Sequence, residues 1–368
     1  MAYVARRVHF RGELSPNDAR HVKTKRSTLL LPTARGVRLV ALEYLADAEK
    51  AADKLGLAHD HVALHDFRVA VRRLRSWVRA FEEHLAGAVA RKDRHQLRDI
   101  SDATNLHRDT EVQLDWLRHA AKGISRKRKV GAGWLRDYVR SRQRLAGVPL
   151  DNELIEQFRQ AQSYLTDRLS RVDEPTKHAE KSTTSLAQAI AVRVMPHLDV
   201  VGSALKYVRS SVDEVPAHRA RIAAKRLRYL IEPAAPHVKQ GQEILERLKS
   251  LQDELGALHD AHVMAHQLHD ALAASATTEV ERLTTRAFGH SVWSADSGNG
   301  QATGKCATAT AVTTLAPRRG MLALANRLRD DTERAFARIE KHWLGDHFDK
   351  FGRDVRAFAA RLELLHAR

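Results

Sequence analysis

The chain of 368 residues carries 62 Lys and Arg against 45 Asp and Glu, giving a net charge of +17 and a pI near 10.2. A surplus of that size predicts a polyanionic partner, which could be nucleic acid, an anionic membrane face or a phosphate polymer. Aromatic residues make up only 5% of the chain, which argues against binding of single strands by base stacking. The single cysteine, Cys306, excludes an internal disulfide framework and fits a reducing compartment.

The N-terminal segment 1–20 is charged and contains no apolar run, so we expect no signal peptide. The chain also contains no apolar stretch of the length that a membrane-spanning helix requires. These two features predict a basic protein of the cytoplasm.

Helical periodicity dominates the chain after an N-terminal segment, 1–34, that we expect to be a basic, disordered tail. From Val37 onward apolar residues recur at three-and-four spacing, and Gly56 is expected to end the first helix. Segment 172–182 breaks the pattern, and segment 291–320, rich in Gly, Ser, Thr and Ala, predicts a flexible loop. Strand alternation is absent, so we predict an all-α fold of helical bundles. The further helices are expected near 59–86, 91–107, 109–122, 134–145, 151–172, 183–210, 216–232, 241–258, 260–274, 278–288, 320–342 and 346–366.

Two pairs of matching segments predict an internal duplication. "HDFRVAVRRLR" (65–75) aligns with "HRARIAAKRLR" (218–228) at an offset of 153 residues. "LRDISDATNLHRDTEV" (97–112) aligns with "LKSLQDELGALHDAHV" (248–263) at an offset of 151 residues. The domain then divides into repeat one, residues 35–175, and repeat two, residues 176–366.

The basic residues of each matched segment fall on one stripe of a helix, because successive residues turn by about 100°. In the first segment the apolar residues, such as Phe67, Leu74 and Trp77, centre on the opposite side. Arg73 and Arg226 lie to one side of the stripe in both copies. The stripe consists of His65, Arg68, Arg72, Arg75 and Arg79 in the first segment and of His218, Arg221, Lys225 and Arg228 in the second.

Charge opposite an apolar face is also what an ordinary solvated helix shows. Acidic partners at i+3 or i+4 would be expected on such a helix, but Asp66 is the only acidic residue within 65–80. The same self-repelling arrangement occurs twice, which favours a binding face for an anion. Arginine suits that task, because its planar guanidinium makes paired hydrogen bonds to phosphate oxygens and stays charged. Basic residues on such a stripe are about 5 Å apart along the axis and could follow consecutive phosphates.

With both matched pairs, the chain resembles the CHAD domain family, and the resemblance covers residues 35–366. The resemblance implies two four-helix bundles with a basic groove between them. It also implies binding of inorganic polyphosphate and association with polyphosphate granules. The residues that it implies for anion contact are His65, Arg68, Arg72, Arg73, Arg75, Arg98, His218, Arg221, Lys225, Arg226, Arg228 and Lys249. To these the stripe adds Arg79, and the histidine-rich segment that follows adds His259 and His262.

The chain departs from the family pattern at one turn, where repeat two keeps Leu255-Gly256 but repeat one has Thr104-Asn105. This difference concerns the turn after the third helix of repeat one and leaves the basic stripe unaffected. CHAD domains are often joined to a CYTH triphosphatase-type domain with an E-x-E-x-K strand, and this chain shows no such motif.

The segment "HDAHVMAHQLHD" (259–270) places four histidines on one helical stripe. Histidines at i,i+3 or i,i+4 can share a transition metal, so His262, His266 and His269 are metal candidates. Four ligands along one helix span about 15 Å, which is too far for one ion. We therefore favour a contribution to anion binding, with no cofactor, and expect binding to strengthen as the pH falls through about 6.5.

Catalytic motifs are absent: the sequence contains no nucleophile elbow, Walker phosphate loop or H-E-x-x-H segment, so we expect a binding protein and no enzyme. The leading prediction is polyphosphate binding. The alternatives are a protein that binds the DNA backbone and a helical scaffold with a metal-binding histidine helix.

Overall fold

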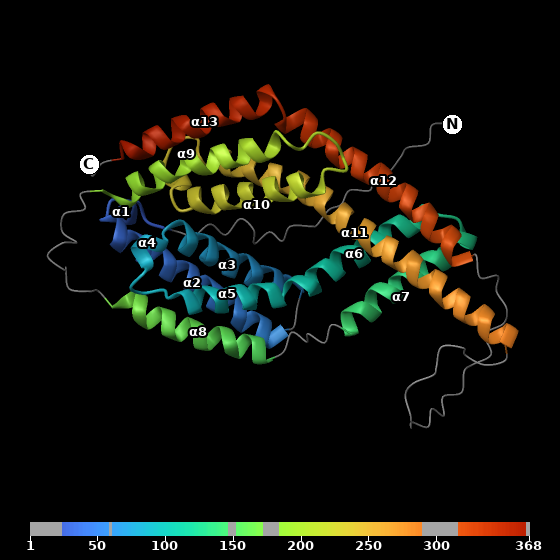
Figure 1. The fold of residues 1–368 in the computed structure, drawn as a ribbon. Coiled ribbons are helices and arrows are strands. Elements are labelled where there is room, and N and C mark those ends of the chain that lie inside the picture. Colours follow the sequence, from blue (N-terminus) through green and yellow to red (C-terminus); the bar gives the residue numbers. More distant parts are fainter. Residues whose placement is uncertain (1–23, 59–60, 146–151, 172–183, 289–315, 366–368) are drawn as a thin grey trace. The chain divides into compact units, whose positions relative to one another are not determined.

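The computed structural model describes residues 24–58, 61–145, 152–171, 184–288 and 316–365. Across these residues the regular secondary structure is helical, with one isolated β-bridge between Pro32 and Ser185, which confirms the all-α prediction. In the same residues no helix is both long and apolar enough to cross a bilayer. The α-helices are α1 (Arg26–Leu29), α2 (Thr33–Ala58), α3 (His61–Ala80), α4 (Glu82–Leu85), α5 (Arg91–Ala103), α6 (Asn105–Lys122), α7 (Lys129–Leu145), α8 (Asn152–Ser170), α9 (Leu186–Leu205), α10 (Glu214–Ile231), α11 (Gly241–Phe288), α12 (Ala316–Trp343) and α13 (Asp346–Glu363) (Figure 1).

The described residues form two compact units, and each unit combines segments from both halves of the chain. The smaller unit comprises residues 110–145, 260–288 and 316–332. The larger unit comprises the remaining described residues. Helices α6, α11 and α12 contribute residues to both units.

The larger unit contains a four-helix bundle built from repeat one. Helix α2 packs against α3 and α8, and α5 packs against α3 and α8, which closes the ring of four. Its core is apolar and aromatic: Trp77 is buried, and its indole nitrogen donates a hydrogen bond to the carbonyl oxygen of Val37 at 3.0 Å. Phe67 and Phe158 meet edge to face, with ring centroids 5.0 Å apart, and so join α3 to α8.

Repeat two supplies a second four-helix bundle to the same unit. Helix α9 packs against α10 and α13, as Figure 1 shows in yellow-green and red. The first part of α11 completes the ring: Gln252 donates to the carbonyl oxygen of Ala224 in α10, and Arg247 pairs with Asp354 in α13 at 2.6 Å. The fold therefore shows the duplicated four-helix bundles that the sequence predicts.

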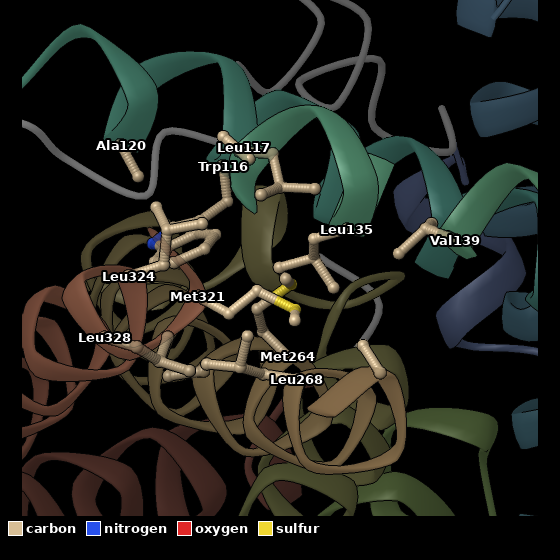
Figure 2. Close-up of a cluster of buried hydrophobic side chains, with 13 residues drawn as sticks. Trp116, Leu117, Ala120, Leu135, Val139, Met264, Leu268, Met321, Leu324 and Leu328 are labelled. Atoms are coloured by element: carbon tan, nitrogen blue, oxygen red, sulfur yellow. The ribbon is translucent and has the colours of Figure 1, made fainter. Parts of the chain in front are cut away.

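The smaller unit has its own hydrophobic core, which the sequence did not predict as a separate assembly. Figure 2 shows the side chains that α6, α7, α11 and α12 direct into it. Trp116 is 4% exposed, and its indole nitrogen donates to the carboxylate of buried Asp331 at 3.1 Å. The buried residues of this core are Trp116, Leu117, Ala120, Ala132, Leu135, Val139, Ala261, Met264, Leu268, Ala271, Met321, Leu324 and Leu328.

Several helix ends differ from the predictions. Helix α2 continues past Gly56 to Ala58, and α11 is one continuous helix where the sequence predicted three, over 241–258, 260–274 and 278–288. At the place in repeat one that aligns with Leu255-Gly256, Thr104 caps α5 and α6 begins at Asn105. The Thr104 hydroxyl is buried and donates to the carbonyl oxygen of Ser101 at 2.7 Å, which satisfies a group at the helix end.

Two segments predicted to be irregular are partly helical. The tail predicted over 1–34 lies outside the described residues up to position 23, but Thr24, Thr28 and Leu29 are buried and α1 lies within it. The hydroxyl of Thr24 donates to Glu43, which ties this segment to α2. The loop predicted over 291–320 lies outside the described residues up to 315, and residues 316–320 begin α12.

Candidate anion-binding site

The two helices that carry the basic stripes, α3 and α10, pack against each other within the larger unit. The Arg73 guanidinium donates two hydrogen bonds to the Glu232 carboxylate, at 2.9 and 2.6 Å, and both side chains are buried. Burial disfavours a charged guanidinium, but the carboxylate outweighs it and raises the pKa of Arg73. The structure thus corrects one prediction: Arg73 joins the two repeats and is not exposed to an anion.

Four arginines at this contact lack an acidic partner. Among the described residues no carboxylate lies within ion-pair distance of Arg72 or Arg79 on α3, or of Arg226 or Arg228 on α10. The Nε atom of Arg228 is buried and has no hydrogen-bond partner in the described part of the chain. Several half-buried arginines elsewhere do have such a partner, for example Arg168 with Asp93 at 2.7 Å. The positive charge is therefore left uncompensated at the α3–α10 contact.

Most of the stripe residues are half-buried, which an ordinary solvated face would not show. The half-buried members are His65, Arg72, Arg75, His218, Arg221, Lys225 and Arg228. Arg79 is exposed, while Arg68 is only 7% exposed and belongs to the interior of the larger unit. Taking charge partly out of water costs free energy unless an opposite charge compensates it. The arrangement therefore favours the prediction of a binding face.

The pKa values of neighbouring groups report the positive potential of this site. Burial raises the pKa of the Tyr229 phenol. The charges of Arg228, Arg72 and Arg73 lower it by more than burial raises it, so the net shift of the pKa is downward. Burial lowers the pKa of Arg226, and the charge of Arg79 lowers it again. An anion bound between these groups would relieve the repulsion.

The predicted residues of the following helices lie in different surroundings. Arg98 on α5 is exposed and shares the carboxylate of Asp102 with Arg75, at 3.4 and 4.0 Å. Burial and the nearby charges of Arg98, Arg72 and Arg79 hold the pKa of Arg75 below its usual value, against the effect of Asp102. Lys249 on α11 is half-buried, and no described residue pairs with it.

Two histidines meet at the edge of the site. The rings of His218 on α10 and His259 on α11 have centroids 4.9 Å apart, and the Nδ1 atom of His218 is buried without a hydrogen-bond partner among the described residues. Burial lowers the pKa of His218, and the charges of Arg221 and Lys225 lower it further, whereas Glu214 raises it. His218 is therefore neutral at pH 7.

We predict that polyanion affinity rises as the pH falls from the pKa of His218 in the complex toward its lowered pKa in the free protein. A bound anion favours the imidazolium and raises the pKa of His218, so binding takes up a proton between the two pKa values. One linked proton changes the affinity by up to about tenfold per pH unit. Titration of long-chain polyphosphate at several pH values measures the effect. His218→Asn should remove this component, while His347→Ala, at an exposed position of α13, should keep it.

The histidine-rich part of α11 does not converge on a metal site. His262 is 9% exposed and belongs to the smaller unit, unlike the other predicted anion ligands. His266 is exposed, and His269 is 85% exposed beside Asp270. Among the described residues no group of three or more His, Cys, Asp or Glu could hold a metal ion.

The sequence could not identify several residues of the site. The repeat alignment makes Glu232 the equivalent of Arg79. This reversal of charge was the only feature of the sequence that could have marked Glu232. His197 on α9 lies close enough to Arg226 and Arg79 for both charges to act on it, and no sequence pattern marks it.

An all-helical, internally duplicated protein with uncompensated arginines on two contacting helices is the class that fold and site define. The chain belongs to the CHAD domain family, because the family model matches residues 39–269. A solved structure with a similar fold is the crystal structure of the CHAD domain from the plant Ricinus communis, at 17% sequence identity and a TM-score of 0.52. The similarity covers 94% of this chain and 97% of the plant chain. A search of curated proteins found no match.

Proposed function

We propose that the protein binds inorganic polyphosphate at the α3–α10 contact and does so without cleaving it. The family is generally linked to polyphosphate binding. The observation that carries the proposal is the set of four arginines on contacting helices that have no carboxylate partner among the described residues: Arg72, Arg79, Arg226 and Arg228. Guanidinium groups bind phosphate oxygens with paired, charge-assisted hydrogen bonds.

A thin phosphate chain suits these residues better than a duplex does. The arginines are mostly half-buried, so a ligand must approach closely with unshielded phosphates. Duplex DNA is read by side chains that protrude into a groove and by exposed basic residues along a backbone. Association with polyphosphate granules in the cytoplasm follows as part of the same proposal.

Arg72→Ala with Arg228→Ala should weaken binding of labelled long-chain polyphosphate by about 100-fold or more at near-physiological salt. The reason is that each charge-assisted hydrogen bond contributes about 1.5–3 kcal/mol. Arg118→Ala with Arg136→Ala removes the same charge from exposed positions of the smaller unit, beside Asp115 and Asp137, and should change the affinity little. Equal loss in both double variants would show that net charge alone governs binding.

Duplex DNA at equal phosphate concentration serves as the competitor in the same titration. If DNA does not displace polyphosphate, the result supports a site for the phosphate polymer. If DNA displaces it readily, DNA binding would become the favoured function. The chain length of the polyphosphate, measured after incubation, should not change, since binding without cleavage is proposed.

A further inference from the structure

The last turns of α11 extend beyond the core of the smaller unit. Ala271 is the last residue of α11 in that core, and the carbonyl oxygen of buried Ser275 accepts a hydrogen bond from Arg318 of α12 at 3.2 Å. Beyond this point, in the described stretch 276–288, no side chain is buried (Figure 1, orange). Most of the stability of a helix comes from packing of an apolar face, so this end is a candidate for contact with a second molecule.

The exposed apolar residues of this segment form one narrow stripe. Val280 and Leu283 are 60% and 50% exposed, and Ala276 and Ala287 are exposed on either side of them. Steps of four, three and four residues separate these positions, which keeps them within about 60° of one another around the helix. This spacing is the a/d seam of a coiled coil. The small alanine side chains would let a second helix approach closely.

The charges of the segment argue against a polyanion or an anionic membrane as its partner. Glu279 and Glu281 balance Arg282 and Arg286, so residues 276–288 have no net charge in a chain that carries +17. A partner with the same balanced charge, such as a second copy of the chain, fits this surface better. Charges more than about 8 Å away are largely screened at physiological ionic strength, so the positive charge elsewhere does not prevent such a contact.

The stripe is complementary to itself when two copies lie antiparallel. In the register that sets Val280 against Leu283 of the second copy, Ala276 meets Ala287 of the second copy. Each of these contacts then occurs twice, as in any interface with twofold symmetry. Large side chains therefore fill the middle of the seam, and small ones lie at both of its ends.

The residues that flank the stripe fit the same register. Glu279 then lies beside Arg286 of the second copy, and Thr277 lies beside Thr284 on the other flank, so no like charges meet. Glu279 also accepts a hydrogen bond from Arg282 of its own helix at 3.1 Å, but a carboxylate can accept from two arginines. A parallel pair would place Glu279 beside Thr284 and form no ion pair, so the charges favour the antiparallel arrangement.

We propose that two copies of the chain associate through residues 276–288 of α11, paired as antiparallel helices. The seam is short compared with the interfaces of about 1,200–2,000 Å² that hold stable dimers, so the dimer is weak and its population depends on protein concentration. The dimer carries two α3–α10 contacts. If these contacts bind polyphosphate as proposed above, a long chain could engage both of them.

Sedimentation velocity of the full chain without polyphosphate tests the proposal. From micromolar to near-millimolar concentration, monomer should convert reversibly to dimer. Glu279→Arg and Arg286→Glu should each raise the dissociation constant at least about tenfold, because each variant replaces two attractive pairs by two like-charge contacts. Glu281→Arg, the same change at an exposed position away from the stripe, should dimerise as the wild type does.

An equimolar mixture of Glu279→Arg and Arg286→Glu should recover the dimer, since every arginine in the mixed pair meets a glutamate. Loss of the bond from Arg282 within one helix cannot produce this recovery. A wild-type protein that stays monomeric at every concentration would overturn the proposal, and so would a mixture that associates no better than the separate variants.

Cross-linking tests the direction of the helices. In a Cys306→Ser background, Val280→Cys protein mixed with Leu283→Cys protein should give mainly the mixed disulfide on oxidation, identified by peptide mass spectrometry. Disulfides that join two copies of the same variant would indicate parallel helices and refute the antiparallel pair. Because no polyphosphate is present, failure of these tests leaves the proposed function untouched. Failure of Arg72→Ala with Arg228→Ala to weaken polymer binding would likewise leave the dimer intact.

Discussion

Arg73→Met is expected to lower the free energy of unfolding of the larger unit by about 3–5 kcal/mol, since removal of one partner of a buried ion pair leaves the other charge unpaired. Glu232 is 3% exposed, and Arg73 supplies both of its short hydrogen bonds. The loss should appear as a lower melting temperature and as faster hydrogen exchange in α3 and α10. Because the protein has two compact units, peptide-resolved exchange is the sharper measurement.

Arg73→Met with Glu232→Leu is the matched control for this prediction. It replaces both charged side chains by apolar groups, and well-packed replacements of this kind are often neutral or stabilising. The double variant should therefore recover most of the lost stability. Polyphosphate affinity, measured below the melting temperature, should change little in either variant, since Arg73 is held inside the fold. If Arg73→Met were stable but had lost its polyphosphate affinity, Arg73 would be a binding residue after all.

The difference between Arg72 and Arg73 shows where sequence reasoning ends. Periodicity placed Arg72 on the stripe and Arg73 to one side, and the structure agrees with that division. The partner of Arg73 is 159 residues away on another helix, so no local pattern could reveal the ion pair. Comparison of the two repeats could have indicated it, because Glu232 is the equivalent of Arg79. A glutamate at that position can pair with an arginine, whereas an arginine cannot.

Helix number and helix grouping were predictable to different degrees. Apolar periodicity predicted most helices, since it reports the buried face of each one. It failed to join the three helices predicted over 241–258, 260–274 and 278–288, which form the single helix α11. The smaller unit was not foreseen, since periodicity does not say which buried face packs against which. Its core brings together residues 116–139 and 261–328, and that grouping is a property of the tertiary structure.

Gly131→Ala is expected to destabilise the smaller unit by about 2 kcal/mol, as overpacking does where helices touch closely. A Cβ at Gly131 would lie 2.6 Å from the Cα of Gly320 and still closer to the carbonyl oxygen of Pro317. Both obstacles are backbone atoms of α12, so α7 and α12 would have to move apart. That movement would disturb the buried packing of Leu135 against this core (Figure 2). Hydrogen exchange in α7 and α12 and the thermal melt measure the effect.

Gly133→Ala is the control on the same helix, two residues further along. Its added Cβ would meet nothing nearer than the Arg136 guanidinium at 3.9 Å, so the better helix propensity of alanine should stabilise α7 by up to about 1 kcal/mol. Opposite signs for the two substitutions would locate the close contact at Gly131, while equal stability would refute it. Because all four uncompensated arginines belong to the larger unit, Gly131→Ala should also leave polyphosphate affinity unchanged below its melting temperature. Loss of stability without loss of affinity would separate the packing of the smaller unit from the chemistry of the α3–α10 contact.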